Sequence, residues 1–133
     1  RIVTLAPELD ARQQVTKLLV EQGVRVSAGH CNPSLAQLDA AIDAGLTMFT
    51  HLGNGCPTKL PRHDNVIQRV LSRADQLLIS FIADGIHVPW YALGNYLQAA
   101  TLQNCFIVSD AISAAGLDRE YIDFLGRKSW STT

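Results

Sequence analysis

Histidine and aspartate side chains stand at the ends of several short apolar runs in this sequence. His30 and His51 end two consecutive runs, and Asp110 follows a later one. Two neutral imidazoles from neighbouring strands can approach a divalent metal at about 2.0–2.1 Å and leave coordination positions for water and substrate. A nearby carboxylate can accept a proton from the attacking water. We therefore predict a metal-assisted hydrolase, with His30 and His51 on the metal and Asp110 as the general base.

Three further polar residues stand at comparable positions. Glu8 follows the first apolar run, and Asp84 and His87 follow the fourth. Glu8 can take part in the site, or it can fix its loop by accepting backbone hydrogen bonds, and both interpretations stay open. Asp84 precedes Gly85, a pair typical of a turn.

The loop after His51 contains two glycines around an asparagine, Gly53-Asn54-Gly55, and continues to Arg62. Glycine lets the backbone approach a ligand closely, and consecutive amides can form an anion-binding concavity. The planar guanidinium of Arg62 can clamp a phosphate. Beside a metal pair, this loop indicates an anionic substrate.

The elements that must position these residues follow from an alternation of apolar runs with helical patterns, which is typical of consecutive βα units. The predicted strands are Ile2–Ala6, Val24–Ala28, Thr47–Leu52, Leu77–Ala83 and Cys105–Val108. The predicted helices are Asp10–Gln22, a helix begun by Asn32-Pro33 and ended by Gly45, Asn65–Arg73, and a helix from Pro89 to about Leu102. Apolar residues at helical spacing, including Val15, Leu18 and Leu35, are expected to face the sheet.

These units predict an α/β fold with about five consecutive parallel strands. Five strands do not close a barrel of eight, so the chain forms either an open sheet or part of a larger (β/α)8 TIM-type barrel, and we favour the partial barrel. In such barrels the active site gathers at the carboxyl ends of the strands. That is where the predicted metal and catalytic residues stand.

Composition excludes several classes of protein. The 133 residues are 47% hydrophobic and 17% charged, with a formal net charge of −1, which predicts neither nucleic-acid binding nor an acidic membrane surface as partner. No apolar run approaches the roughly 18 residues of a membrane span. The three cysteines, Cys31, Cys56 and Cys105, form no Cys-x-x-Cys pair, which disfavours a structural zinc site and favours a reducing, cytoplasmic setting.

Five stretches carry a family resemblance in their order and spacing. They are Val3–Glu8, Val26–His30, Phe49–Asn54, Ile82–Val88 and Val108–Ala111. Together they resemble the N-acetylglucosamine-6-phosphate deacetylases of the amidohydrolase superfamily. The resemblance implies hydrolytic deacetylation of N-acetylglucosamine 6-phosphate to glucosamine 6-phosphate and acetate, with a divalent metal, zinc ahead of iron, as cofactor.

The resemblance also implies a role for each matching residue. His30 and His51 match the two histidine metal ligands, and Asp110 matches the catalytic aspartate at the end of the last barrel strand. Asn54 and the Gly55 backbone match the loop that binds the substrate phosphate. Arg62 and His87 match phosphate-binding positions that family members can contribute across a dimer interface, so a phosphorylated amino sugar and a homodimer are the expected partners.

Other family features find no match in these residues. They include a metal-binding glutamate on an earlier strand, a His-x-His strand and the histidine that polarises the acetyl carbonyl. Residues 1–117 are therefore expected to form a partial amidohydrolase barrel, and residues 118–133 a tail related to the family's small β-domain. We expect the isolated chain to be an incomplete catalyst.

Two other functions stay open at the level of the residues. One is another amidohydrolase reaction on the same barrel, such as ring opening or deamination, because a fold does not determine its chemistry. The other is a non-catalytic barrel fragment that binds metal or sugar phosphate.

Overall fold

The structure, a computed structural model, describes residues 1–112, 115, 121–124 and 127–130. Its main sheet contains β1 (Ile2–Leu5), β2 (Arg25–Ala28), β3 (Leu46–Phe49), β4 (Leu78–Ile82) and β5 (Cys105–Val108). The α-helices are α1 (Gln14–Glu21), α2 (Leu35–Asp43), α3 (Val66–Leu71) and α4 (Trp90–Ala100), with short 3-10 turns at Pro7–Leu9, Ala11–Gln13 and Leu102–Asn104.

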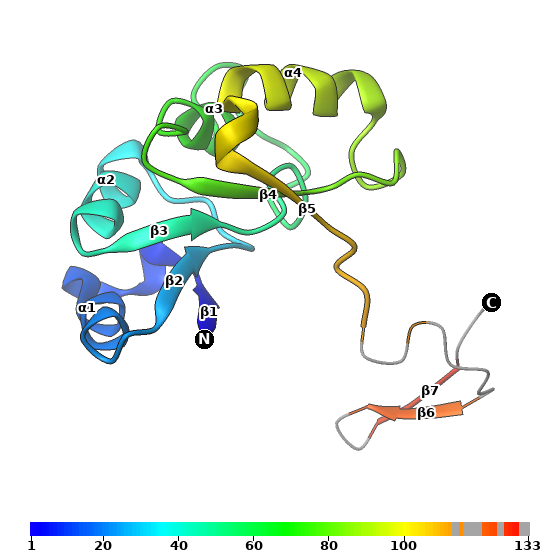
Figure 1. Cartoon of the computed structure of the whole chain (residues 1–133), viewed down its shortest axis with the longest axis horizontal. Coiled ribbons are helices and arrows are strands. Elements are labelled where there is room, and N and C mark those ends of the chain that lie inside the picture. The colour runs from blue at the N-terminus through cyan, green and yellow to red at the C-terminus, as the bar shows by residue number, and fades with distance from the viewer. Residues whose placement is uncertain (113–114, 116–120, 125–126, 131–133) are drawn as a thin grey trace.

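The sheet has the strand order β1-β2-β3-β4-β5, and every neighbouring pair is parallel. One α-helix connects each strand to the next, and Figure 1 shows the four helices gathered on one side of the curved sheet. A doubly wound sheet carries helices on both faces, whereas a (β/α) barrel carries them only outside. The five consecutive parallel strands predicted from the sequence are confirmed.

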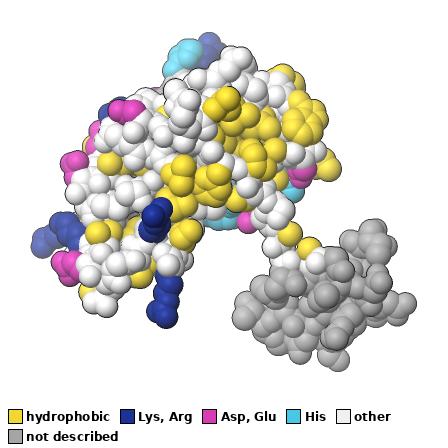
Figure 2. Space-filling model, viewed as in Figure 1, with side chains coloured by type: hydrophobic (Ala, Val, Ile, Leu, Met, Phe, Trp, Pro, Cys, Tyr) yellow, Lys and Arg dark blue, Asp and Glu magenta, His cyan; other side chains and the backbone are white. Residues whose placement is uncertain are grey.

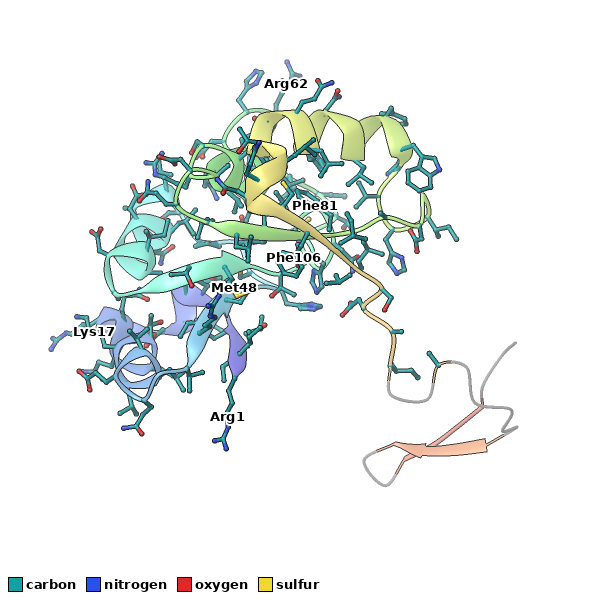
Figure 3. All side chains as sticks on the ribbon, viewed as in Figure 1. Arg1, Lys17, Met48, Arg62, Phe81 and Phe106 are labelled. Carbon is teal, nitrogen blue, oxygen red and sulfur yellow. The ribbon has the colours of Figure 1, made fainter. Side chains whose placement is uncertain are left out.

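The core lies between this sheet and its helices. On β4, a continuous apolar run typical of a strand buried on both faces, Ile79 and Phe81 are fully buried. Figure 3 shows Phe81 in the interior, between β4 and the helices. Leu38 and Ala41 of α2 and Val66 and Val70 of α3 pack into the same core, at the helical spacing that the sequence predicted.

The two outer strands leave apolar side chains exposed. Ile2 of β1 is 58% exposed and Ile107 of β5 is 56% exposed. Figure 2 shows hydrophobic side chains gathered on the face where β5 and α4 lie. Exposed edges of this apolar character are a template for pairing with another chain or segment.

In the described part of the chain, no helix is long and apolar enough to cross a membrane.

The first helix begins later than predicted, at Gln14 instead of Asp10. Arg12 and Gln13 adopt left-handed backbone angles (φ 57° and 56°), so the chain is kinked before the helix starts. The Asp10 carboxylate accepts hydrogen bonds from the backbone N–H groups of Val15 and Thr16, at 3.0 and 2.8 Å. Asp10 therefore caps α1 across the kink, a contact that helical periodicity could not reveal.

The predicted start of the second helix was also wrong. The N-cap is Ser34, whose hydroxyl accepts from the Gln37 N–H while the Gln37 side chain accepts from the Ser34 N–H, which is a complete capping box. Val15, Leu18 and Leu35, expected to face the sheet, are 51%, 56% and 38% exposed.

The tail contains β6 (Tyr121–Phe124) and β7 (Arg127–Trp130), which pair antiparallel as a separate two-stranded sheet. The predicted division into a barrel segment (1–117) and a tail (118–133) stays a prediction, because its boundary lies outside the described residues.

Candidate active site

Four candidate residues occupy equivalent positions at the carboxyl end of the sheet. His30, His51, Asp84 and Asp110 each stand two residues after the last residue of β2, β3, β4 and β5. Because parallel strands end at the same edge of a sheet, this spacing places their backbones along one rim.

The structure brings the two histidines into contact. Their Nε2 atoms are 3.0 Å apart, and the rings meet edge to face with centroids 4.7 Å apart. Two nitrogens bound at about 2.0–2.1 Å in a tetrahedral shell lie roughly 3.3 Å apart, so the pair needs little movement to share one cation. His51 is 2% exposed, whereas His30 faces solvent.

Asp110 joins this pair from β5. Its Oδ2 lies 3.8 Å from His51 Nε2, and its side chain is half exposed. The carboxylate therefore approaches the same nitrogen that faces His30, and it is open to water. His30, His51 and Asp110 are called the rim triad below.

All three residues of the rim triad have strained backbone conformations. His30, His51 and Asp110 have φ angles of 50°, 36° and 51°, in the left-handed region that non-glycine residues rarely adopt. Such strain costs about 1–3 kcal/mol per residue and persists where the surrounding structure holds it, commonly at functional sites.

The buried His51 is held from the neighbouring strand. Its backbone N–H donates to Ser80 Oγ of β4 at 2.7 Å. Its ring Nδ1 is buried and has no hydrogen-bond partner among the described residues. Ser80 is not among the residues predicted from the sequence, although a serine inside the apolar run Leu77–Ala83 is a signal that could have marked it.

His30 is packed against the glycine-containing loop. A Cβ added at Gly55, which has φ +66°, would lie 2.7 Å from His30 Nδ1. The loop can thus lie on the imidazole only because residue 55 is glycine. Gly55, Glu8, His30 and Cys56 are among the residues that line an open pocket of about 340 Å³.

Glu8 fixes a loop, which agrees with one of the two interpretations drawn from the sequence. Its Oε1 accepts from the backbone N–H of Asn32 at 2.6 Å. Burial raises the pKa of the neighbouring Cys31 thiol to about 12, with the charge of Glu8 as the second cause. Cys31 therefore stays a neutral packing residue.

His87 is paired with Asp84 at the end of β4. Asp84 Oδ1 accepts from the backbone N–H groups of Ile86 and His87, at 2.8 and 2.9 Å, and Asp84 Oδ2 lies 2.6 Å from His87 Nδ1. The turn predicted at Asp84 is confirmed. The carboxylate also fixes the ring of His87, which leaves His87 Nε2 free for a ligand.

We predict that Asp84→Asn destabilises the fold in a pH-dependent way. The backbone hydrogen bonds from His87 and Ile86, followed by the His87 side chain, lower the pKa of Asp84 to about 2. Because the folded pKa lies below the usual value of about 3.9, the stabilisation is full above about pH 4 and is lost as pH falls through about 2. The Tm of Asp84→Asn should therefore fall below wild type at pH 7, and the gap should narrow below pH 4.

Thermal unfolding followed by circular dichroism from pH 7 to pH 3 measures this gap. Asp75→Asn, which changes an exposed aspartate, is the matched control and should leave Tm close to wild type throughout. A deficit of constant size at every pH would contradict the role of the Asp84 charge.

Of the predicted phosphate-binding residues, Asn54 and Gly55 lie beside the histidine pair, whereas Arg62 and His87 do not contact it. Asn54 donates its backbone N–H to the His51 carbonyl at 2.9 Å, which places the loop beside the pair. Arg62 is exposed, and Figure 3 shows it at the periphery of the molecule, pointing away from the sheet. Within the described residues, no hydrogen bond joins Arg62 or His87 to either rim histidine.

The described residues contain no group of three or more His, Cys, Asp or Glu side chains that could hold a metal ion. Asp110 Oδ2 of the rim triad lies 3.8 Å from His51 Nε2. The fold presents two imidazoles in contact and a carboxylate next to one of them.

No protein-family model matches the chain. The N-acetylglucosamine-6-phosphate deacetylase of Mus musculus is 41% identical over 124 residues, which cover 87% of this chain and 29% of the mouse protein. The N-acetylgalactosamine-6-phosphate deacetylase of Shewanella sp. is 33% identical over 129 residues, which cover 96% of this chain and 32% of that protein. The chain thus spans about a third of the length of the curated relatives that it matches.

Solved structures give the same result. The N-acetylglucosamine-6-phosphate deacetylase of Pasteurella multocida superposes with a TM-score of 0.80 at 30% identity, over 98% of this chain and 34% of that chain. A mutant of the Mycobacterium smegmatis enzyme in complex with N-acetyl-D-glucosamine-6-phosphate also superposes with a TM-score of 0.80, at 30% identity, over 95% of this chain and 32% of that chain. The predicted partial barrel is confirmed.

Proposed function

We propose that this chain carries the catalytic base and two metal ligands of an N-acetylglucosamine-6-phosphate deacetylase. The chain is similar to such enzymes over about one third of their length. The reaction is the hydrolysis of N-acetylglucosamine 6-phosphate to glucosamine 6-phosphate and acetate. The observation that carries the proposal is the convergence of the rim triad, with His30 Nε2 at 3.0 Å and Asp110 Oδ2 at 3.8 Å from His51 Nε2.

His30 and His51 would hold the divalent cation through their Nε2 atoms. Imidazole suits both zinc and iron, and we favour zinc, which commonly binds two or three histidines in hydrolytic sites. When bound, the cation supplies Lewis-acid activation of water and of the amide carbonyl. The described residues provide an incomplete set of ligands, so a further ligand, such as the glutamate expected from the family, would complete it.

Asp110 would move the proton. Its half-exposed carboxylate can accept a proton from the attacking water and then deliver it to the departing amine nitrogen. This dual role requires the carboxylate within about 2.6–3.2 Å of both groups. The 3.8 Å separation of Asp110 Oδ2 from His51 Nε2 supports this role, because it keeps the carboxylate next to the proposed metal pair.

The phosphate of the substrate would be held by the loop after His51. The Gly55 backbone lies against His30, and the Asn54 backbone N–H donates to the His51 carbonyl, which keeps this loop beside the histidine pair. His87 is oriented by Asp84 through its Nδ1. Holding the phosphate at a fixed distance from the cation would position the acetamide for attack. The expected substrate class is therefore a phosphorylated N-acetyl amino sugar.

The family resemblance implies a homodimer in which Arg62 reaches the site of a second copy. The exposed guanidinium of Arg62 points away from the sheet, which leaves it accessible to such a copy. Planar guanidinium groups bind phosphate with two parallel hydrogen bonds.

We predict that Arg62→Ala raises KM for the phosphorylated substrate by about 10- to 100-fold, the effect of losing a charge-assisted hydrogen bond of about 1.5–3 kcal/mol. kcat should change little, since Arg62 would bind the phosphate and not the reacting amide. Steady-state kinetics in a grafted enzyme, the mouse relative with its matching third replaced by this chain's residues, measures both constants. The matched control is Lys59→Ala, an exposed cation on the same loop. An equal rise in KM for unphosphorylated N-acetylglucosamine would contradict the role of Arg62.

The function itself is tested in the same grafted enzyme by the release of acetate. The N-acetylgalactosamine relative makes the galacto epimer a second candidate substrate. The ratio of kcat/KM for the two sugar phosphates decides between them, and absence of acetate from both would overturn the proposal.

The three free cysteines fit the cytoplasmic setting that we propose.

A further inference from the structure

Ser80 is a polar residue inside the most buried strand of the sheet. It belongs to β4, between the fully buried Ile79 and Phe81, and is itself 3% exposed. A hydroxyl at such a position needs hydrogen-bond partners, because an unpaired buried polar group is costly. Its partners all lie on the segment that carries His51.

Ser80 accepts from two consecutive backbone groups of that segment. His51 N–H donates to Ser80 Oγ at 2.7 Å, and Leu52 N–H donates to the Ser80 carbonyl at 2.9 Å. The Ser80 hydroxyl in turn donates to the Phe49 carbonyl at 3.4 Å.

These bonds begin where the regular pairing of β3 with β4 stops. The last paired residues are Phe49 and Ile79, and two residues later His51 turns into the left-handed region at φ 36°. At that turn the N–H of His51 is directed to a side chain instead of a strand carbonyl. The hydroxyl of Ser80 thus takes the place of the sheet bond that the turn removes.

We infer that Ser80 is a positioning residue for His51, acting through the backbone to keep His51 Nε2 beside His30. The inference rests on the proposed function, because it concerns the ability of His51 to bind a divalent cation. Alanine at position 80 would leave the buried N–H of His51 without a partner. The turn would then relax toward ordinary backbone angles and carry the His51 imidazole away from His30. In the structure the Nε2 atoms of the two histidines are 3.0 Å apart.

Zn²⁺ titration of the full chain, followed by the ring ¹⁵N and ¹H NMR signals of its histidines, tests this inference. Ser80→Ala should weaken Zn²⁺ binding by about 10- to 100-fold, as loss of an outer hydrogen-bond partner of a metal-binding histidine commonly does. Ser80→Cys keeps a weak hydrogen-bond acceptor in nearly the same volume. Its affinity for Zn²⁺ should therefore lie between those of wild type and Ser80→Ala. Ser27→Ala is the matched control, since Ser27 is an equally buried strand serine whose hydroxyl bonds to Thr50 and Ala28. It should bind Zn²⁺ within about threefold of wild type.

The outcomes separate this inference from the proposed function. If His51→Ala reduces Zn²⁺ binding while Ser80→Ala and Ser80→Cys both bind like wild type, the role of Ser80 is overturned and the metal site stands. If His51→Ala binds Zn²⁺ like wild type, the metal site itself fails. Equal weakening of Zn²⁺ binding in Ser80→Ala and Ser27→Ala would overturn the inference as well, because loss of any buried serine would then have the same effect. Thermal unfolding of the metal-free variants provides the comparison of stability.

Discussion

Replacing Asp110 with asparagine should lower kcat for acetate release in the grafted enzyme by about 10²- to 10⁴-fold, the range typical of a lost general acid–base group. Asparagine keeps the shape of the side chain but cannot accept a proton from water. Zn²⁺ and the sugar phosphate should still bind, because Asp110 lies 3.8 Å from His51 Nε2 and outside the phosphate loop. The expected result is a loss confined to turnover.

Steady-state kinetics measures kcat, and equilibrium titration with Zn²⁺ and with glucosamine 6-phosphate measures binding. Asp75→Asn, which neutralises an exposed aspartate away from the rim triad, controls for the change in charge and should keep kcat within about twofold. Undiminished turnover in Asp110→Asn would remove this residue from the mechanism, and lost Zn²⁺ binding would make it a metal ligand instead.

Replacing His51 with alanine should weaken Zn²⁺ binding in the grafted enzyme by more than the roughly 10- to 100-fold that loss of an outer-shell partner costs. His51 supplies the nitrogen that lies closest to both His30 and Asp110. Acetate release should fall with the metal content, since loss of one of the two imidazole ligands leaves the shell around the cation incomplete. Metal analysis of the purified variant, together with a chelator competition, measures the loss.

His63→Ala is the matched control for this variant. His63 is the histidine outside the rim triad and the Asp84 pair, and it lies exposed on the loop after His51. Its removal should leave metal content and turnover near wild type. Comparable metal loss in both variants would indicate adventitious binding to surface histidines and would contradict the proposed site.

The strands and the candidate rim residues could be predicted from the sequence because both depend on local patterns. Apolar runs bounded by Gly and Pro predicted the five strands, including β5 over the same residues, Cys105–Val108. The regular placement of His30, His51 and Asp110 after those runs predicted that they would share one edge of the sheet. Their chemical roles stay predictions that the experiments above test.

The helix starts could not be predicted equally well, because they depend on side-chain contacts with the backbone. Asn32-Pro33 has the composition of a helix start, yet Ser34 caps α2, since Gln37 completes its capping box. Asp10 lies inside the predicted first helix, but its carboxylate instead caps α1 across the kink at Arg12 and Gln13. Several cap candidates compete within a few residues, and small differences in local geometry decide among them.

The sequence by itself determined which residue types stand at the strand ends, because the lengths of strands and the positions of turns depend on the types of consecutive residues. Only the tertiary structure decided how those side chains meet. The 3.0 Å approach of His30 to His51 depends on left-handed backbone angles, on the absence of a Cβ at Gly55 and on the Ser80 hydroxyl from the next strand. These contacts join residues up to 29 positions apart, and no periodicity in the sequence encodes them.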